Sequence, residues 1–215
     1  ITEDRDFSAY PFLIAPAYQL LDEGLVARWK TYAENGGHLI LTCRTGQKDR
    51  RGHLWEAAWA APIHNLIGAG IKFYDTLPAP NVAQVKAGGQ THDWSTWGDV
   101  LEPRAGTTAL ATYADQYYAG GVAAITCQLG KGSVTYVGVD SLTGSLEAQL
   151  VRDVFARAGV ATENLAEGFL VDWRDGLWVA TNSTEKTQPA PIPAQAKILL
   201  GTREVPIAGV TVWRE

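Results

Sequence analysis

One stretch near the N-terminus constrains the fold most, because it has the pattern of a strand, a helix and a strand in direct succession. Residues 12–16 (Phe-Leu-Ile-Ala-Pro) form a short apolar run, which is typical of a strand buried on both faces. Asp22 can cap a following helix, and residues 35–37 (Asn-Gly-Gly) can end it. Residues 38–43 are a second apolar run. The sequence therefore predicts a parallel βαβ unit.

The segment after this unit is polar and then aromatic. Residues 44–51 carry most of the polar groups, and Trp55 and Trp59 follow them. The carboxyl end of a parallel strand is where α/β folds bind ligands or partners. Residues 62–67 can form a short helix with Pro62 in its first turn.

From residue 71 to residue 136 the pattern changes to short strands with frequent turns. Residues 128–134 (Gln-Leu-Gly-Lys-Gly-Ser-Val) predict a hairpin, because glycine supplies the positive φ that its turn needs. Ser145 can cap a helix that ends at Gly159. Its apolar residues share one face: Leu146, Leu150, Val151, Val154 and Phe155.

The last quarter of the chain has a different texture. Residues 169–173 and 177–181 flank Arg-Asp-Gly, which is a strong hairpin signal. A proline-rich bend follows, and residues 196–200 and 209–213 are two more candidate strands. We expect an α/β domain over residues 1–162 and a small all-β domain over residues 163–215.

Composition excludes several classes of partner. The chain has 18 Lys and Arg against 23 Asp and Glu, a net charge of -5, so it lacks a broad cationic surface for nucleic acid or anionic lipid. No apolar run approaches the ~18 residues that span a bilayer.

Two cysteines are too few for a disulfide framework, which favours a reducing, cytoplasmic compartment. The chain has no methionine and begins at Ile1, so we expect a piece of a longer polypeptide.

Catalytic, cofactor and metal motifs are not convincing. Cys43 at a strand end could be a nucleophile, but that chemistry needs a histidine and a carboxylate, and no histidine follows in the later strand-to-helix segments. Cys127 has no basic neighbour, so core packing is favoured for both. Residues 130–133 join strands rather than opening a helix, which argues against a phosphate loop. His53 and His64 lack metal-ligand spacing. We therefore predict no catalytic residue, no cofactor and no metal site.

The eight tryptophans carry more information. Flat apolar rings suit both large packed interfaces and carbohydrate contact. The candidates for subunit or sugar contact are Trp55, Trp59, Trp94 and Trp97, and core packing remains the alternative for each.

Five stretches of the chain form a series with a recognisable order and spacing: residues 10–21, 32–46, 97–103, 111–120 and 129–138. Together they resemble the C-terminal part of the β-galactosidases of glycoside hydrolase family 42. The matches fit along the whole chain, and the series of five is more specific than any single stretch.

The resemblance implies a fold and a set of partners. It implies a flavodoxin-like or class I glutamine amidotransferase-like sheet with helices on both faces, which packs a homotrimer, followed by a small antiparallel β domain. The retaining catalytic barrel, with both catalytic glutamates, would lie outside this chain, so this chain alone would not be an enzyme. The parent would bind a galactoside. Another strand and helix would precede Ile1.

Three hypotheses follow from these observations. The first is a non-catalytic assembly and accessory region of a β-galactosidase-like hydrolase, in contact with its own barrel and with neighbouring subunits. The second is a free-standing carbohydrate-binding module that uses exposed tryptophans. The third is an amidotransferase-like enzyme with Cys43 as its nucleophile.

Overall fold

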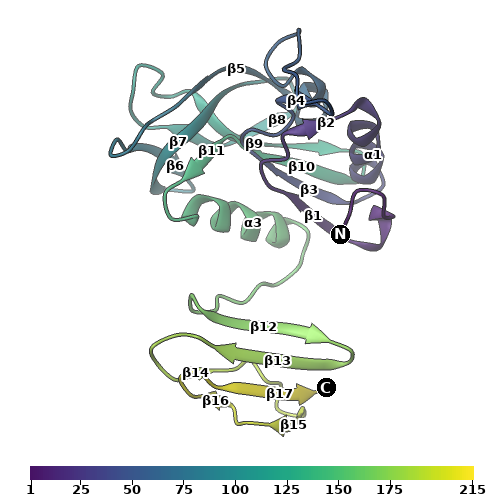
Figure 1. Ribbon diagram of the computed structural model, residues 1–215, viewed down its shortest axis with the longest axis vertical. Coiled ribbons are helices and arrows are strands. Elements are labelled where there is room, and N and C mark those ends of the chain that lie inside the picture. The colour runs from purple at the N-terminus through teal and green to yellow at the C-terminus, as the bar shows by residue number, and fades with distance from the viewer. The chain divides into compact units, whose positions relative to one another are not determined.

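The computed structural model describes residues 1–215, which form two compact units, Ile1–Val160 and Ala161–Glu215 (Figure 1). The elements of the first unit are η1 (Phe7–Ala9), β1 (Phe12–Ala15), β2 (Leu20–Leu21), α1 (Glu23–Glu34), β3 (His38–Thr42), β4 (Lys48–Asp49), η2 (Ala61–Ile63), α2 (His64–Ile67), β5 (Ala69–Asp75), β6 (Ala83–Ala87), β7 (Gln90–Pro103), β8 (Thr107–Tyr113), β9 (Val122–Leu129), β10 (Gly132–Val137), β11 (Val139–Ser141) and α3 (Ser145–Arg157). None of the helices has the length and apolar character needed to cross a membrane.

The predicted βαβ unit is confirmed. β1 and β3 pair in parallel, and Asp22 caps α1 by accepting a hydrogen bond from the Leu25 amide at 2.7 Å. The chain leaves α1 through Gly36, whose φ of +116° disfavours other residues. A Cβ on Gly37 would lie 2.1 Å from the Tyr32 ring, so glycine is required for the helix to pack beside β3.

The first unit is mostly sheet, with few helices. Its nine strands run in the order β1-β3-β10-β9-β8-β6-β7-β11, with β5 also paired to β7. Only the β1–β3 and β3–β10 pairs of this sheet are parallel. The strands from β5 to β9 form an antiparallel region, because the turn-rich segment that encodes them contains no helix to return the chain. The predicted hairpin at residues 128–134 is confirmed as β9–β10.

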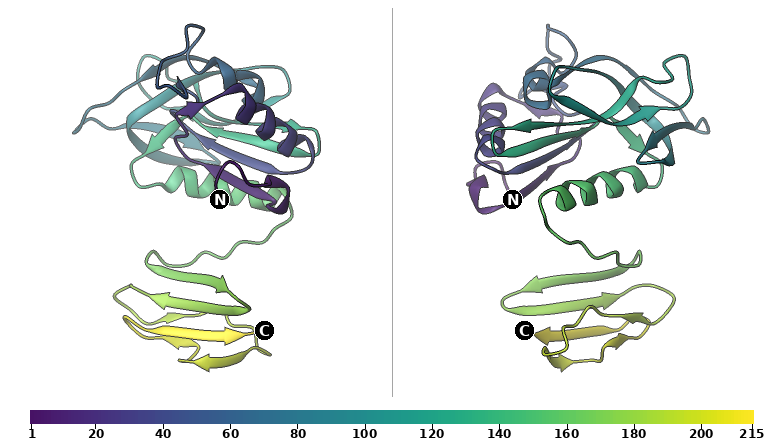
Figure 2. Two further views of the ribbon diagram at one scale, coloured as in Figure 1. Left: turned by 45° about the vertical axis from the view of Figure 1, so that its right-hand side comes forward. Right: turned by 180° about the vertical axis from the view of Figure 1, so that it is seen from behind.

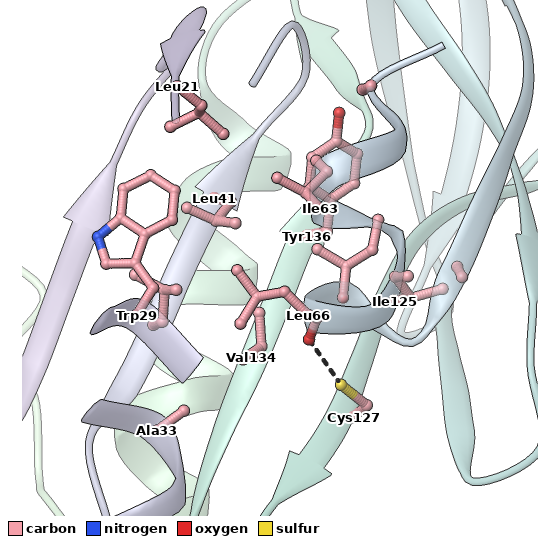
Figure 3. Close-up of a cluster of buried hydrophobic side chains, with 14 of the residues drawn as sticks. Leu21, Trp29, Ala33, Leu41, Ile63, Leu66, Ile125, Cys127, Val134 and Tyr136 are labelled. Carbon is pink, nitrogen blue, oxygen red and sulfur yellow. Dashed lines mark hydrogen bonds between the residues drawn. The ribbon is translucent and has the colours of Figure 1, made fainter. Parts of the chain in front are cut away.

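Two hydrophobic cores lie on opposite faces of the parallel strands. On one face, Trp29 of α1 packs with Leu41, Val134 and Leu66 (Figure 3). On the other, α3 buries Leu146, Leu150 and Val154, and its Phe155 ring stacks on Phe12 of β1 at 3.8 Å. Because Phe12 and its neighbour Leu13 point to opposite faces, α1 and α3 cover the two sides of the same strands (Figure 2).

The start of α3 differs from the prediction in one detail. Ser145 is the first helical residue, and Gly144 precedes it in the left-handed conformation without a side-chain cap. The Ser145 hydroxyl instead pairs with His92 Nδ1 at 2.8 Å. A contact between α3 and β7 has therefore taken the hydroxyl that local sequence assigned to capping.

The second unit is a small all-β structure, and the strands predicted for it are present. Its elements are β12 (Phe169–Arg174), β13 (Leu177–Asn182), β14 (Gln188–Pro189), β15 (Lys197–Leu200), β16 (Glu204–Val205) and β17 (Val210–Arg214). β12 and β13 form the expected hairpin, with positive φ at Asp175 and Gly176. Phe169, Ala180 and Trp213 belong to its core.

Candidate functional site

Three aromatic rings from separate elements stack together at the surface of the first unit. Trp59 precedes η2, Tyr74 lies on β5 and Trp97 lies on β7. The Tyr74 ring centroid is 4.3 Å from that of Trp97 and 4.5 Å from that of Trp59. Tyr74 is 43% exposed, and both tryptophans are half-buried. We call Trp59, Tyr74 and Trp97 the aromatic cluster; it joins two of the four predicted contact tryptophans.

Arg44 lies over this cluster. It follows β3, and its φ of +67° is uncommon for a residue with a side chain. Its guanidinium carbon is 5.2 Å from the Trp97 ring centroid, which is within cation–π range. The Nε atom of Arg44 is buried and has no hydrogen-bond partner. The prediction of a polar contact segment after the second strand covers this residue but did not single it out.

A buried carboxylate holds Trp97 in place. Asp99 is fully buried and accepts hydrogen bonds from Trp97 Nε1 at 2.9 Å and from the Tyr136 hydroxyl at 2.6 Å. The Tyr113 hydroxyl donates to the Asp99 carbonyl at 2.9 Å. Burial raises the pKa of Asp99 to about 6, although the hydrogen bonds from Tyr136 and Trp97 oppose that rise. Sequence analysis did not identify Asp99, because its partners lie on distant strands.

The site lies at the carboxyl ends of the parallel strands. Just beyond β3, the Cys43 amide donates to the Val137 carbonyl at 2.7 Å. Just beyond β10, the Gly138 carbonyl accepts from the Asp99 amide at 2.6 Å. Arg44 and Asp99 are therefore placed at the sheet edge where open α/β sheets bind ligands or partners.

Comparison with known proteins assigns the family. The sequence profile described as the beta-galactosidase trimerisation domain matches residues 1–163. The chain belongs to the beta-galactosidase trimerisation domain family. The beta-galactosidase BgaH of Haloferax lucentense is 31% identical over 209 residues, which are 95% of this chain and 31% of that protein. The beta-galactosidase Bga of Halorubrum lacusprofundi is 32% identical over 196 residues, which are 86% of this chain and 28% of that protein.

Solved structures agree with the trimerisation-domain assignment. The beta-galactosidase of Halorubrum lacusprofundi superposes with a TM-score of 0.87 at 29% identity, over 100% of this chain and 33% of that one. The cold-adapted beta-galactosidase of Rahnella sp. R3 has the same fold, with a TM-score of 0.87 at 22% identity, over 100% of this chain and 34% of that one. This chain thus spans about a third of the length of its relatives, and its residues contain no catalytic barrel.

The other predicted tryptophans lie elsewhere in the trimerisation domain. Trp94 is fully buried and packs edge-on against Tyr113 at 5.6 Å, so the core alternative applies and Trp94 is not available for contact. Trp55 is half-buried beside a surface cavity of about 840 Å³, and its Nε1 atom is buried without a hydrogen-bond partner. Other residues of that cavity include Glu23, Lys30, His53 and Asn65.

The two cysteines of the trimerisation domain are packing residues. Cys43 is 6% exposed, and burial, assisted by the nearby Asp99 charge, raises the pKa of its thiol. The Cys127 thiol is buried and lies 3.6 Å from the Leu66 carbonyl, to which it donates (Figure 3). The described residues contain no cluster of three or more side chains that could hold a metal ion.

Proposed function

We propose that this chain is the assembly and accessory region of a β-galactosidase of glycoside hydrolase family 42, and that it joins three subunits into a homotrimer. The observation that carries this is the aromatic cluster beside an unpaired Arg44, at the surface of a domain from the trimerisation family. Aromatic and arginine side chains dominate the energetics of protein interfaces. The family match supports the same role.

The proposal extends to the rest of the parent protein. A retaining catalytic barrel on another part of the polypeptide would bind and cleave the galactoside, and this chain would pack against it. Two free, buried cysteines fit a cytoplasmic setting. The parallel strands β1, β3 and β10 would be the core of a class I glutamine amidotransferase-like sheet.

Sedimentation velocity of the purified chain tests the assembly role. We expect a species of three times the 23.2 kDa of one chain, in equilibrium with monomer at low concentration. Trp59→Ala should shift this equilibrium towards monomer, because it removes an interface ring. Trp94→Phe is the matched control, since the altered ring is fully buried. A chain and a parent protein that both remain monomeric at all concentrations would refute the proposal.

The Trp55 cavity supports a second candidate function, carbohydrate binding. An indole wall next to charged and amide side chains can stack on a sugar ring and bind its hydroxyls. Galactosides or plant cell-wall oligosaccharides should then quench tryptophan fluorescence in a saturable way, and Trp55→Ala should abolish that signal. Absence of saturable binding to the unmodified chain would exclude this function.

A further inference from the structure

Arg44 differs from every other arginine in the chain. It is the single arginine that is not exposed, yet its guanidinium makes no hydrogen bond or ion pair within the chain. By contrast, the exposed Arg50 binds the carboxylates of Glu3 and Asp22. A half-buried guanidinium offers up to five N–H donors, and buried donors are nearly always satisfied in folded proteins.

The backbone holds Arg44 in a fixed position. The turn after β3 is pinned by the Thr45 hydroxyl, which donates to the Thr42 carbonyl at 2.7 Å, and by the Gly46 amide, which donates to the Tyr18 carbonyl at 2.9 Å. Thr45 is fully buried. A non-glycine residue keeps a positive φ only where its surroundings fix it, so the direction in which the Arg44 side chain leaves the backbone is fixed. The contact with Trp97 restrains the guanidinium itself, which lowers its ordering cost on binding.

The acidic groups nearest to Arg44 are already engaged or too far away for an ion pair. Asp99 accepts hydrogen bonds from Trp97 and Tyr136, and the Arg44 charge opposes the rise that burial causes in its pKa, but the carboxylate and the guanidinium form no ion pair. Glu147 accepts hydrogen bonds from the Ser141 amide and hydroxyl. The Arg44 charge opposes the rise that burial causes in the pKa of Asp140, but the two side chains form no ion pair. The Arg44 Nε therefore has no partner among these groups, and among protein side chains the planar fork of a guanidinium matches a carboxylate.

We infer that Arg44 binds a carboxylate side chain from a second copy of this chain, with Trp97 as one wall of the contact. This inference rests on the proposed assembly function. A second copy is a suitable source, because Asp and Glu outnumber Lys and Arg by 23 to 18. In a cyclic trimer each contact joins two different patches, so Arg44 meets an acidic patch rather than another Arg44. Trp59 and Trp97 shield the pair from water, which strengthens it.

Four variants of the full chain test the inference by sedimentation velocity across a salt series. Arg44→Gly removes the side chain, and glycine adopts the positive φ of this position freely, so loss of assembly cannot come from a strained fold. Arg44→Ala should weaken assembly equally, and Arg44→Lys, which keeps the charge without the fork, should do so less. Arg174→Ala is the control, because its exposed arginine has only a 3.7 Å contact with Asp172.

We expect Arg44→Gly and Arg44→Ala to raise the trimer dissociation constant at least about tenfold and to flatten its salt dependence. Arg174→Ala should leave both unchanged. A trimeric wild type whose dissociation constant is the same in Arg44→Gly would overturn the Arg44 contact and leave the assembly role standing. A wild type that never associates, alone or in the parent protein, would overturn the assembly role itself and this inference with it.

Discussion

Trp94 and Trp97 lie on the same strand, β7, but they belong to regions of opposite character. Trp94 is fully buried, in the core covered by α3, and packs against Tyr113. Trp97 lies in the half-exposed aromatic cluster, with Arg44 on one side and the Asp99 carboxylate at its indole nitrogen. The difference shows that an aromatic residue type does not define a role, because burial decides whether a ring stabilises the fold or can meet a partner.

Trp94→Ala gives the largest expected effect and tests the core side of the comparison. Loss of a fully buried indole should lower the free energy of unfolding by about 3–5 kcal/mol, measured by urea denaturation. Trp94→Phe should cost less, because it leaves a smaller cavity. If Trp94→Ala kept wild-type stability but disrupted assembly, the division between the two regions would be wrong.

Asp99 lies between the two regions and should make their stability depend on pH. Its folded-state pKa is about 6, above its ordinary value of 3.8, so the folded state binds the proton more tightly than the unfolded state. This contribution to stability is complete below pH 4 and is lost as the pH rises through 6. Two pKa units correspond to about 3 kcal/mol.

Asp99→Asn removes this titration and serves as the reference. Between pH 4 and pH 7 the wild type should lose about 2.4 kcal/mol of unfolding free energy relative to Asp99→Asn. Urea denaturation at a series of pH values measures the difference, in which the other titrating groups cancel. Parallel pH profiles for the two proteins would show that the Asp99 pKa is not raised.

The local parts of this structure could be predicted from sequence, and the site could not. The βαβ unit and the β12–β13 hairpin depend on short-range periodicity and on glycine at turns, all within a few residues of one another. Arg44, Trp59, Tyr74 and Asp99 meet only because β7 pairs with β5 and lies against the end of β10, the strand next to β3. Such nonlocal pairing leaves no periodic signal in a single sequence.

The sequence contained one clue to the position of the site, but this clue was not enough to identify its residues. A polar residue directly after a buried parallel strand marks the edge where sites form, and Arg44 occupies that position. Its positive φ and its unpaired guanidinium are visible only in the structure. The tryptophans could not be assigned from sequence either, because the number of tryptophans does not show which of them are buried and which lie at the surface.

Trp97→Phe should have a moderate effect on the surface side of the comparison. Phenylalanine keeps a ring in the aromatic cluster but cannot donate to Asp99, which should cost about 1 kcal/mol of stability. Loss of this donor should also raise the pKa of Asp99 further, because the hydrogen bond favours the charged form. A Trp97→Phe protein whose stability profile against pH matched the wild type would show that the indole does not hold the carboxylate.

The smallest expected effect separates backbone strain from side-chain contacts at Arg44. Arg44→Gly and Arg44→Ala both delete the guanidinium, so they lose the same contact with Trp97. They differ only in how well each residue tolerates a φ of +67°, which costs an L-residue about 1–2 kcal/mol and glycine almost nothing. After the greater chain entropy of glycine in the unfolded state is subtracted, Arg44→Gly should be the more stable variant by about 0.5–1 kcal/mol in urea denaturation. Equal stability would mean that the turn relaxes when the side chain is removed, and that the guanidinium is not held by its backbone. If the expected difference is found, the stability of the two variants reports the backbone strain at Arg44, and their shared loss of assembly reports the contact made by its side chain.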